Sequence, residues 1–247
     1  NAPSNLKFVN GASLTYKGAA IELNTSSLSV SGGGSLLLKN DGSNPFTLNN
    51  ADGELEFSGA YTTTVSHVKI SSGDATNSPV IKMTSNAVIS NLTQTGFSEL
   101  NIATGKSLSI TQDFEVTDQK QMKISGADGT LSLGGNITLS GILNISVADS
   151  TLEGGSLTLN GGTVQVGQDI NLKSNLLQQA DSSIVVAAGK TLSYSGNEFN
   201  TGAQTLTLSG GGIFANTEFL ALNDPASSLK LNGIAKVSKI SVSADMT

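Results

Sequence analysis

The chain has 247 residues, of which 13% are charged, 4% are aromatic and none is Trp or Cys. Its hydrophobic content of 37% is too high for a disordered chain, and its net charge of -6, without any Arg, argues against the clustered positive field that nucleic-acid binding needs. No apolar run approaches the roughly 18 residues of a membrane-spanning helix, so we expect no transmembrane segment. No break in composition divides the chain, which predicts a single domain over residues 1–247.

A pattern of apolar residues two apart begins close to the amino-terminal end. It starts at Leu6 and Phe8, and Leu14, Leu36 and Leu55 then follow at intervals of about 20 residues. The first residues include neither an initiating Met nor a signal peptide. We therefore expect a processed product or a piece of a longer protein.

Two pairs of carboxylates stand two residues apart, Glu54 with Glu56 and Asp113 with Glu115. Paired carboxylates can act as acid and base when they lie within about 5–10 Å of each other, which neighbours on one strand do. Alternating polar residues are also what the solvated face of a half-buried strand requires. We favour this structural interpretation for both pairs.

The single histidine, His67, lies in a strand-like segment in which Val68 and Ile70 are expected inside and His67 and Lys69 outside. Without a Cys or a second His, it offers no metal cluster. The nucleophile-elbow and phosphate-loop patterns are also missing from the sequence. We expect no catalytic role for this residue.

Four aspartates in predicted turns are candidates for calcium ligands, because turn carboxylates on adjacent coils could gather oxygen ligands. They are Asp41, Asp52, Asp74 and Asp128. Asp-Gly is first of all a turn-forming pair, so the structural interpretation is favoured here too. No cofactor is expected, and calcium is the one metal candidate.

The apolar pattern is clearest from Leu131 to Leu172. Apolar residues at i and i+2 lie on one face of a strand, and the Gly-rich pairs between them turn the chain. Each unit therefore predicts a short strand with one buried face. The pairs are Leu131/Leu133, Ile137/Leu139, Leu143/Ile145, Leu157/Leu159, Val164/Val166 and Ile170/Leu172.

Three such units make one coil of about 20 residues, which agrees with the spacing of Leu131, Leu152 and Leu172. The pattern predicts an all-β fold, a right-handed parallel β-helix with three sides and roughly 11 coils. A left-handed helix of hexapeptides is the nearer alternative, but the six-residue step slips to seven and longer. A sandwich or an antiparallel barrel would show turn signals about every 8–12 residues.

Four segments depart from the repeat, and binding residues are expected in such loops. The segment from Ser195 to Thr201 combines amides, a carboxylate and an aromatic ring, the chemistry of a sugar or peptide contact. Its candidate ligand contacts are Asn197, Glu198, Phe199 and Asn200. The alternative, that Phe199 plugs the end of a coil, is favoured because Phe is more often buried than exposed. The other three segments are Ser71 to Ser78, Thr117 to Gln121 and Leu176 to Ser182.

The segments 156–162, 188–192 and 205–212 resemble the degenerate repeats of bacterial surface β-helices, namely autotransporter passengers and filamentous-haemagglutinin-like adhesins. This resemblance covers most of the chain and rests on the strand pattern and on Gly-rich turns. It implies a secreted or surface-displayed stalk or adhesin in bacteria. The chain departs from those families in showing no translocator barrel and no secretion or capping module.

The sequence thus predicts a non-catalytic, extracellular structural or adhesive segment. Its expected partners are a glycan or protein on a host or neighbouring cell and, at its uncapped ends, further solenoid coils. A carbohydrate-active β-helix is the alternative, although the chain lacks the Arg of the lyases of that fold and the adjacent Asp pair and Gly-His-Gly motif of the hydrolases. A phage-type fibre, which would be an obligate trimer, is a third hypothesis.

Overall fold

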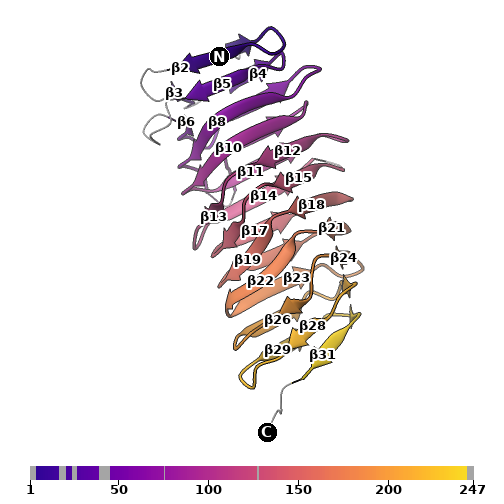
Figure 1. Cartoon of the computed structure of the whole chain (residues 1–247). Helices are drawn as coiled ribbons and strands as arrows, with labels where there is room; N and C mark the ends of the chain where they lie inside the picture. Colours follow the sequence, from indigo (N-terminus) through magenta and orange to yellow (C-terminus); the bar gives the residue numbers. More distant parts are fainter. Residues whose placement is uncertain are drawn as a thin grey trace.

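The computed structural model describes residues 4–16, 21–23, 27–38, 45–74, 76–126 and 128–243. These residues form strands and turns and no helix. The chain winds into an elongated β-solenoid of about 10 turns with about 22 residues per turn (Figure 1). The predicted all-β parallel solenoid is confirmed, with a period slightly longer than predicted.

The first face of the solenoid is a sheet to which every coil adds one strand. In spatial order its strands are β1 (Ser4–Lys7), β4 (Ser27–Ser31), β7 (Glu54–Ser58), β9 (Val80–Met83), β11 (Ser98–Ile102), β14 (Gln121–Ser125), β17 (Ile142–Ile145), β20 (Thr163–Val166), β23 (Ser182–Val186), β26 (Thr205–Ser209) and β29 (Ser228–Asn232).

The second face carries the next strand of each coil. Its strands are β2 (Ser13–Tyr16), β5 (Ser35–Leu38), β8 (Thr63–Ile70), β10 (Ala87–Gln94), β12 (Ser107–Ile110), β15 (Thr130–Leu133), β18 (Ser150–Gly154), β21 (Ile170–Leu172), β24 (Thr191–Tyr194), β27 (Ile213–Asn216) and β30 (Lys236–Val237).

The third face is built in separate pieces. It begins with β3 (Ile21–Glu22) and β6 (Phe46–Leu48), continues with β13 (Phe114–Val116), β16 (Ile137–Leu139), β19 (Ser156–Asn160) and β22 (Asn175–Ala180), and ends with β25 (Phe199–Asn200), β28 (Leu220–Leu222) and β31 (Ile240–Val242). Between these pieces the long strands β8 and β10 cover two faces, because β8 pairs with β5 through its first half and with β6 through its second.

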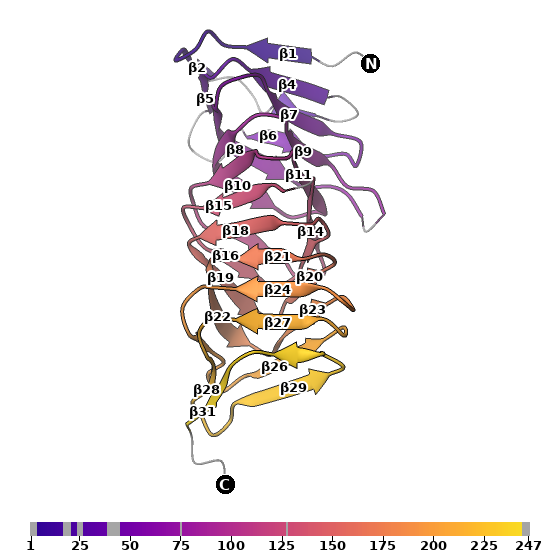
Figure 2. The same ribbon diagram turned by 90° about the vertical axis from the view of Figure 1, so that its right-hand side faces the viewer.

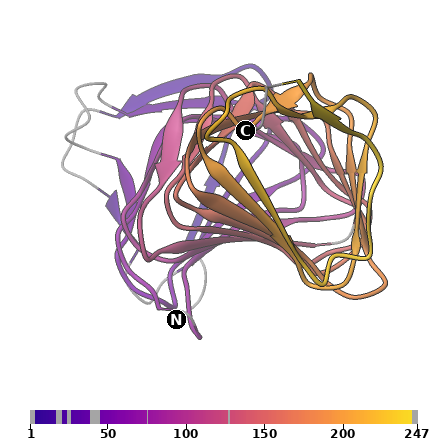
Figure 3. The same cartoon turned by 90° about the horizontal axis from the view of Figure 1, so that it is seen from below.

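Every strand ladder in the described part of the chain is parallel, as a solenoid requires and a sandwich does not. In Figure 2 the strands β18, β21, β24 and β27 face the viewer and run from right to left as the chain descends, which is the right-handed sense. Figure 3 looks along the stack and shows the coils superposed, with an outline that shifts gradually from the first coils to the last.

The core is a set of apolar columns in which each coil places a side chain on its neighbour. Leu131, Leu152 and Leu172 form one such column, because Leu131 pairs with Leu152 and Leu152 pairs with Leu172. Leu143 and Leu157 are also fully buried, as predicted. A contiguous dry column of this kind is the main source of stability in a solenoid.

The earlier leucine series was only partly right. Leu14 pairs with Leu36, but Leu36 pairs next with Val65 on the second face, whereas Leu55 belongs to the first face and pairs with Leu28. The coils near this end are longer than those in the middle, so a fixed interval of about 20 residues changes face. Leu14 is also 43% exposed, unlike the buried leucines of the middle coils.

Two glutamines fill inward positions at the corner between the third and first faces. Gln94 Nε2 donates to the carbonyls of Gly96 and Gln121 at 2.9 and 3.0 Å. Gln178 Nε2 donates in the same way to Ala180 and Thr205 at 3.2 and 2.8 Å. Each amide nitrogen therefore links its own corner to the next coil, while each amide Oε1 is buried without a hydrogen-bond partner among the described residues.

Candidate functional site

The predicted contact segment from Asn197 to Asn200 is a short turn followed by strand β25. Tyr194 Oη anchors it by donating to the carbonyl of Asn197 at 2.6 Å and accepting from Leu176 N at 3.1 Å. Burial raises the pKa of Tyr194, an effect that the Leu176 N–H partly opposes. Asn197, Glu198 and Asn200 are exposed.

Phe199 has no exposed surface, and its ring meets Tyr194 edge-on with centroids 6.5 Å apart. Tyr194 in turn stacks on Phe214 at 6.1 Å. The interpretation of Phe199 as a plug inside a coil is therefore confirmed, and its ring is not available for a ligand. The exposed neighbours remain a predicted contact site without an aromatic platform.

The other three predicted loops differ from one another. Residues 71–74 and 76–78 do lie outside the strands, and Asp74 accepts from the backbone of Thr76 and Asn77 at 2.8 and 2.9 Å. The loop proposed from Thr117 to Gln121 is a tight turn in which Lys120 N donates to Thr117 O at 3.1 Å. The loop proposed from Leu176 to Ser182 is wrong, because most of it is strand β22.

The carboxylate pair of Asp113 and Glu115 flanks buried Phe114 on strand β13, so both side chains point outward. Asp113 Oδ1 accepts from the backbone of Asn136 on the next coil at 2.7 Å. Glu115 Oε1 accepts from the hydroxyl of Ser140, also on that coil, at 2.9 Å. Both carboxylates thus act as links between coils.

The second pair, Glu54 and Glu56, flanks buried Leu55 on strand β7 and also points outward. Glu56 lies 3.6 Å from the ammonium of Lys82, which is its register partner on the next coil. The same device recurs where Glu99 meets Lys123 at 3.1 Å and where Glu153 meets Lys173 at 3.7 Å. These exposed pairs contribute little each, but all of them join neighbouring coils.

His67 lies on the outer side of β8, half-buried, while Val68 and Ile70 point inward as predicted. Its Nε2 is 3.1 Å from Thr93 Oγ1 on the next coil. Burial lowers the pKa of His67, and the positive charge of Lys69 lowers it further. Both effects favour the neutral imidazole, and the ring serves as another link between coils.

The third face brings together groups that are far apart in the sequence. Asn91 and Thr93 on β10, with Asp113 and Glu115 on β13, line a shallow hollow of about 320 Å³. His67 Nε2 contacts the hydroxyl of Thr93, one of the residues that line this hollow. The arrangement gathers polar side chains along three coils, yet its carboxylates already accept hydrogen bonds from the following coil.

The aspartates considered for calcium are turn residues where the structure describes them. Asp41 lies outside the described residues. Asn77 links two of the others, because it donates to Asp52 Oδ1 at 3.2 Å and its backbone donates to Asp74. Within the described residues, no group of three or more His, Asp or Glu side chains is placed to hold a metal ion.

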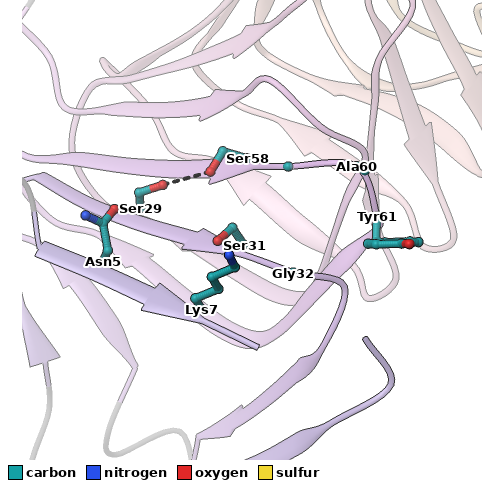
Figure 4. Close-up of a pocket in the computed structure, with 9 residues that line it drawn as sticks. Asn5, Lys7, Ser29, Ser31, Gly32, Ser58, Ala60 and Tyr61 are labelled. Carbon is teal, nitrogen blue, oxygen red and sulfur yellow. Dashed lines mark hydrogen bonds between the residues drawn. The ribbon is translucent and has the colours of Figure 1, made fainter. Parts of the chain in front are cut away.

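A larger hollow of about 560 Å³ lies on the outer side of the first face, over strands β1, β4 and β7. Figure 4 shows Lys7 and Ser31 near its middle, Tyr61 at one end and the bonded hydroxyls of Ser29 and Ser58 at the other. This hollow was not predicted from the sequence. The one available signal was Tyr61, an aromatic residue beside Gly-rich turns in a chain with few aromatics.

Comparison with protein-family models, with curated proteins and with solved structures finds no match to this chain. The resemblance to bacterial surface β-helices therefore rests on the repeat pattern of the sequence and remains a prediction. In the described ranges, no helix is long and apolar enough to cross a membrane.

Proposed function

We propose that this chain is a non-catalytic structural or adhesive β-solenoid segment of a secreted or surface-displayed bacterial protein. The observation that carries the proposal is the use of the outward carboxylates. Asp113 and Glu115 accept hydrogen bonds from the next coil, and Glu56 pairs with a lysine there. Groups that could serve catalysis are thus committed to holding neighbouring coils together.

The regular stacking supports a scaffold that presents its sides to other molecules. Each coil buries its apolar residues and turns short polar side chains outward, so the outer surface can vary without loss of the core. The surface is rich in Ser, Thr and Asn and poor in charge. Together with the resemblance of the repeats, this composition favours an extracellular adhesin or stalk of the autotransporter type.

A carbohydrate-active enzyme is the second candidate, and one observation favours it. Asp113 and Glu115 stand two residues apart beside a polar hollow, and Thr93, which also lines it, contacts His67. However, both carboxylates are exposed, whereas a catalytic acid generally needs burial or a like charge to stay protonated at neutral pH.

Incubation with pectin, alginate, xylan and host glycans, with and without calcium, tests the proposal. We expect no new reducing ends and no unsaturated sugars, while immobilised glycans or cell surfaces retain the intact chain. Turnover that disappears when Asp113 and Glu115 are replaced would overturn the proposal in favour of the enzyme.

A further inference from the structure

The hollow on the first face combines an exposed aromatic ring with a positive charge. Its floor consists of the short side chains of Ser29, Ser31 and Ser58, which leave room above the sheet. Asn5 and Lys7 reach into it from strand β1, and Tyr61 closes it from the turn after β7 (Figure 4).

The backbone of a glycine comes close to Tyr61 at the rim of the hollow. A Cβ added at Gly33 would lie 2.3 Å from Tyr61 Cβ, and Gly33 has a φ of 71°, so a side chain there is disfavoured on both counts. The tyrosine is nevertheless 52% exposed. An aromatic ring that is open on one side presents an apolar surface with a polar edge to a ligand.

Lys7 differs from the paired lysines on the same face. Lys82 and Lys123 each have a glutamate as register partner on the preceding coil. Lys7 pairs with Ser31, and Ser31 pairs with Ser58, so its column holds hydroxyls instead. Within the described residues no carboxylate lies within ion-pair distance of Lys7, which leaves a positive charge at the hollow.

We propose that this hollow binds one or two units of an acidic polysaccharide, a specification that rests on the proposed adhesive function. The C–H face of a pyranose ring packs on Tyr61, its carboxylate or sulfate pairs with Lys7, and its hydroxyls exchange hydrogen bonds with Asn5 and the serines. A peptide is disfavoured because the hollow is shallow and offers no deep apolar pocket for a side chain.

Calorimetric titration of the intact chain with four probes tests the site. The probes are an oligogalacturonate, its neutral methyl ester, a heparin-derived oligosaccharide and a polyglutamate peptide. We expect at least one anionic oligosaccharide to bind about fivefold more tightly than the ester, with affinity that falls as salt rises. Binding of the oligogalacturonate identifies a carboxylate ligand and binding of the heparin fragment a sulfate ligand, and either result supports the proposal.

Tyr61→Ala should weaken the preferred probe about tenfold and Lys7→Gln about fivefold. Phe219→Ala and Lys236→Gln, at the opposite end of the solenoid, are matched controls that should leave affinity unchanged; Phe219 is 45% exposed. Thermal unfolding confirms that each variant is folded. The proposal would be overturned if neither anionic oligosaccharide bound, or if neither Tyr61→Ala nor Lys7→Gln changed the affinity. It would also be overturned if the ester bound as tightly as the anionic probes, or if polyglutamate bound and lost affinity equally in the two variants.

The probes are also analysed after titration. Intact probes that do not bind refute the site while the proposed non-catalytic function stands. Probes that bind through Tyr61 and Lys7 and are then cleaved support the site but refute the non-catalytic function.

Discussion

At the scale of single residues, most of the distinctive polar side chains bond to the coil above or below. His67 meets Thr93, Asp169 accepts from Thr191 N, and Asn216 donates to Lys239 O. His67 and Asp169 make these contacts from the outer side of the solenoid, whereas Asn216 is 4% exposed and makes its contact from an inward position. Residues that suggest chemistry in the sequence therefore have a structural use in the fold.

The imidazole of His67 should titrate below its ordinary pKa. Burial and Lys69 disfavour the protonated form in the folded state, so the unfolded chain binds more protons as pH falls through about 6.5. Stability should therefore rise with pH through this range and fall on acidification. NMR titration gives the pKa of His67. Urea unfolding of the parent and of His67→Gln at several pH values isolates the contribution of His67 to the pH dependence of the free energy of unfolding. A midpoint at or above the ordinary histidine value would contradict the assignment.

Leu157 should tolerate no charge. It is fully buried in β19 between Ile137 and Leu176. Leu157→Asp should lower the free energy of unfolding by roughly 4 kcal/mol or more, because the carboxylate enters a dry column. Leu177→Asp is the control, since Leu177 is 49% exposed, and should cost less than about 0.5 kcal/mol. Equal unfolding midpoints for the two variants in chemical denaturation would show that Leu157 is not in the core.

At the scale of elements, the turns between strands use carboxylates as acceptors for the next coil. Asp169 Oδ1 accepts from Thr191 N and Asp181 Oδ1 accepts from Thr205 N, both at 2.7 Å. Asp113 does the same for Asn136 N at 2.7 Å. In each case an aspartate in a turn accepts a hydrogen bond from a backbone N–H on the next coil. That N–H belongs to the first residue of a strand or to the residue just before it.

Asp169→Ala should lower the free energy of unfolding by about 1 kcal/mol, because Thr191 N loses its acceptor. Asp169→Asn should recover most of this loss, since an amide oxygen can accept the same hydrogen bond. Hydrogen exchange at Thr191 checks the mechanism and should accelerate only in the alanine variant. Unchanged exchange in Asp169→Ala would mean that the carboxylate does not protect this amide.

The elements that the sequence predicts well are those with an unbroken apolar alternation. Residues 131–172 show strand units, faces and buried pairs as predicted, because the inward positions of these pairs hold Leu, Ile or Val. Ser150, an inward residue of β18 outside the predicted pairs, is the exception. Strand β22 was missed because a polar residue, Gln178, occupies an inward position, where its Nε2 donates to the carbonyl of Ala180 and to that of Thr205 on the next coil. A periodicity argument has no means of recognising such a residue.

The hollow beside Tyr61 could not be predicted for a related reason. It depends on which residues of successive coils share a column, and these coils differ in length. The register of Lys7 with Ser31 and of Ser31 with Ser58 appears only when the strands are paired. The burial of Phe199, in contrast, follows from the ordinary preference of an aromatic side chain, and the favoured interpretation was right.

At the scale of the whole molecule, the outermost described strands leave apolar side chains in solvent. Val9 near β1 is 81% exposed, and Leu231, Ile240 and Val242 in the last coil are 52%, 39% and 55% exposed. Unpaired strand edges with apolar residues are templates for further strands. The expected end-to-end contact with further coils is consistent with this exposure and remains a prediction.

Sedimentation of the isolated chain over a wide concentration range separates association through the ends from a phage-type trimer. We expect a monomer at low concentration with weak, concentration-dependent association through the ends, which Leu231→Lys together with Val242→Lys should reduce. The control is Ser109→Lys, which adds the same charge on the outer side of β12 and should leave association unchanged. A lysine at a buried serine such as Ser98 would disturb the core and is not a suitable control. A stable trimer at every concentration would instead favour the phage-type fibre.

The central claim is that the outward carboxylates hold coils together and perform no chemistry. The most direct test measures turnover on the polysaccharide panel and thermal unfolding side by side for the parent, for Asp113→Ala with Glu115→Ala, and for Asp118→Ala as an exposed control on the same coil. The account predicts no turnover in any of them and a lower unfolding midpoint for the double variant alone. Turnover by the parent that vanishes in the double variant, with the midpoint unchanged, would contradict it.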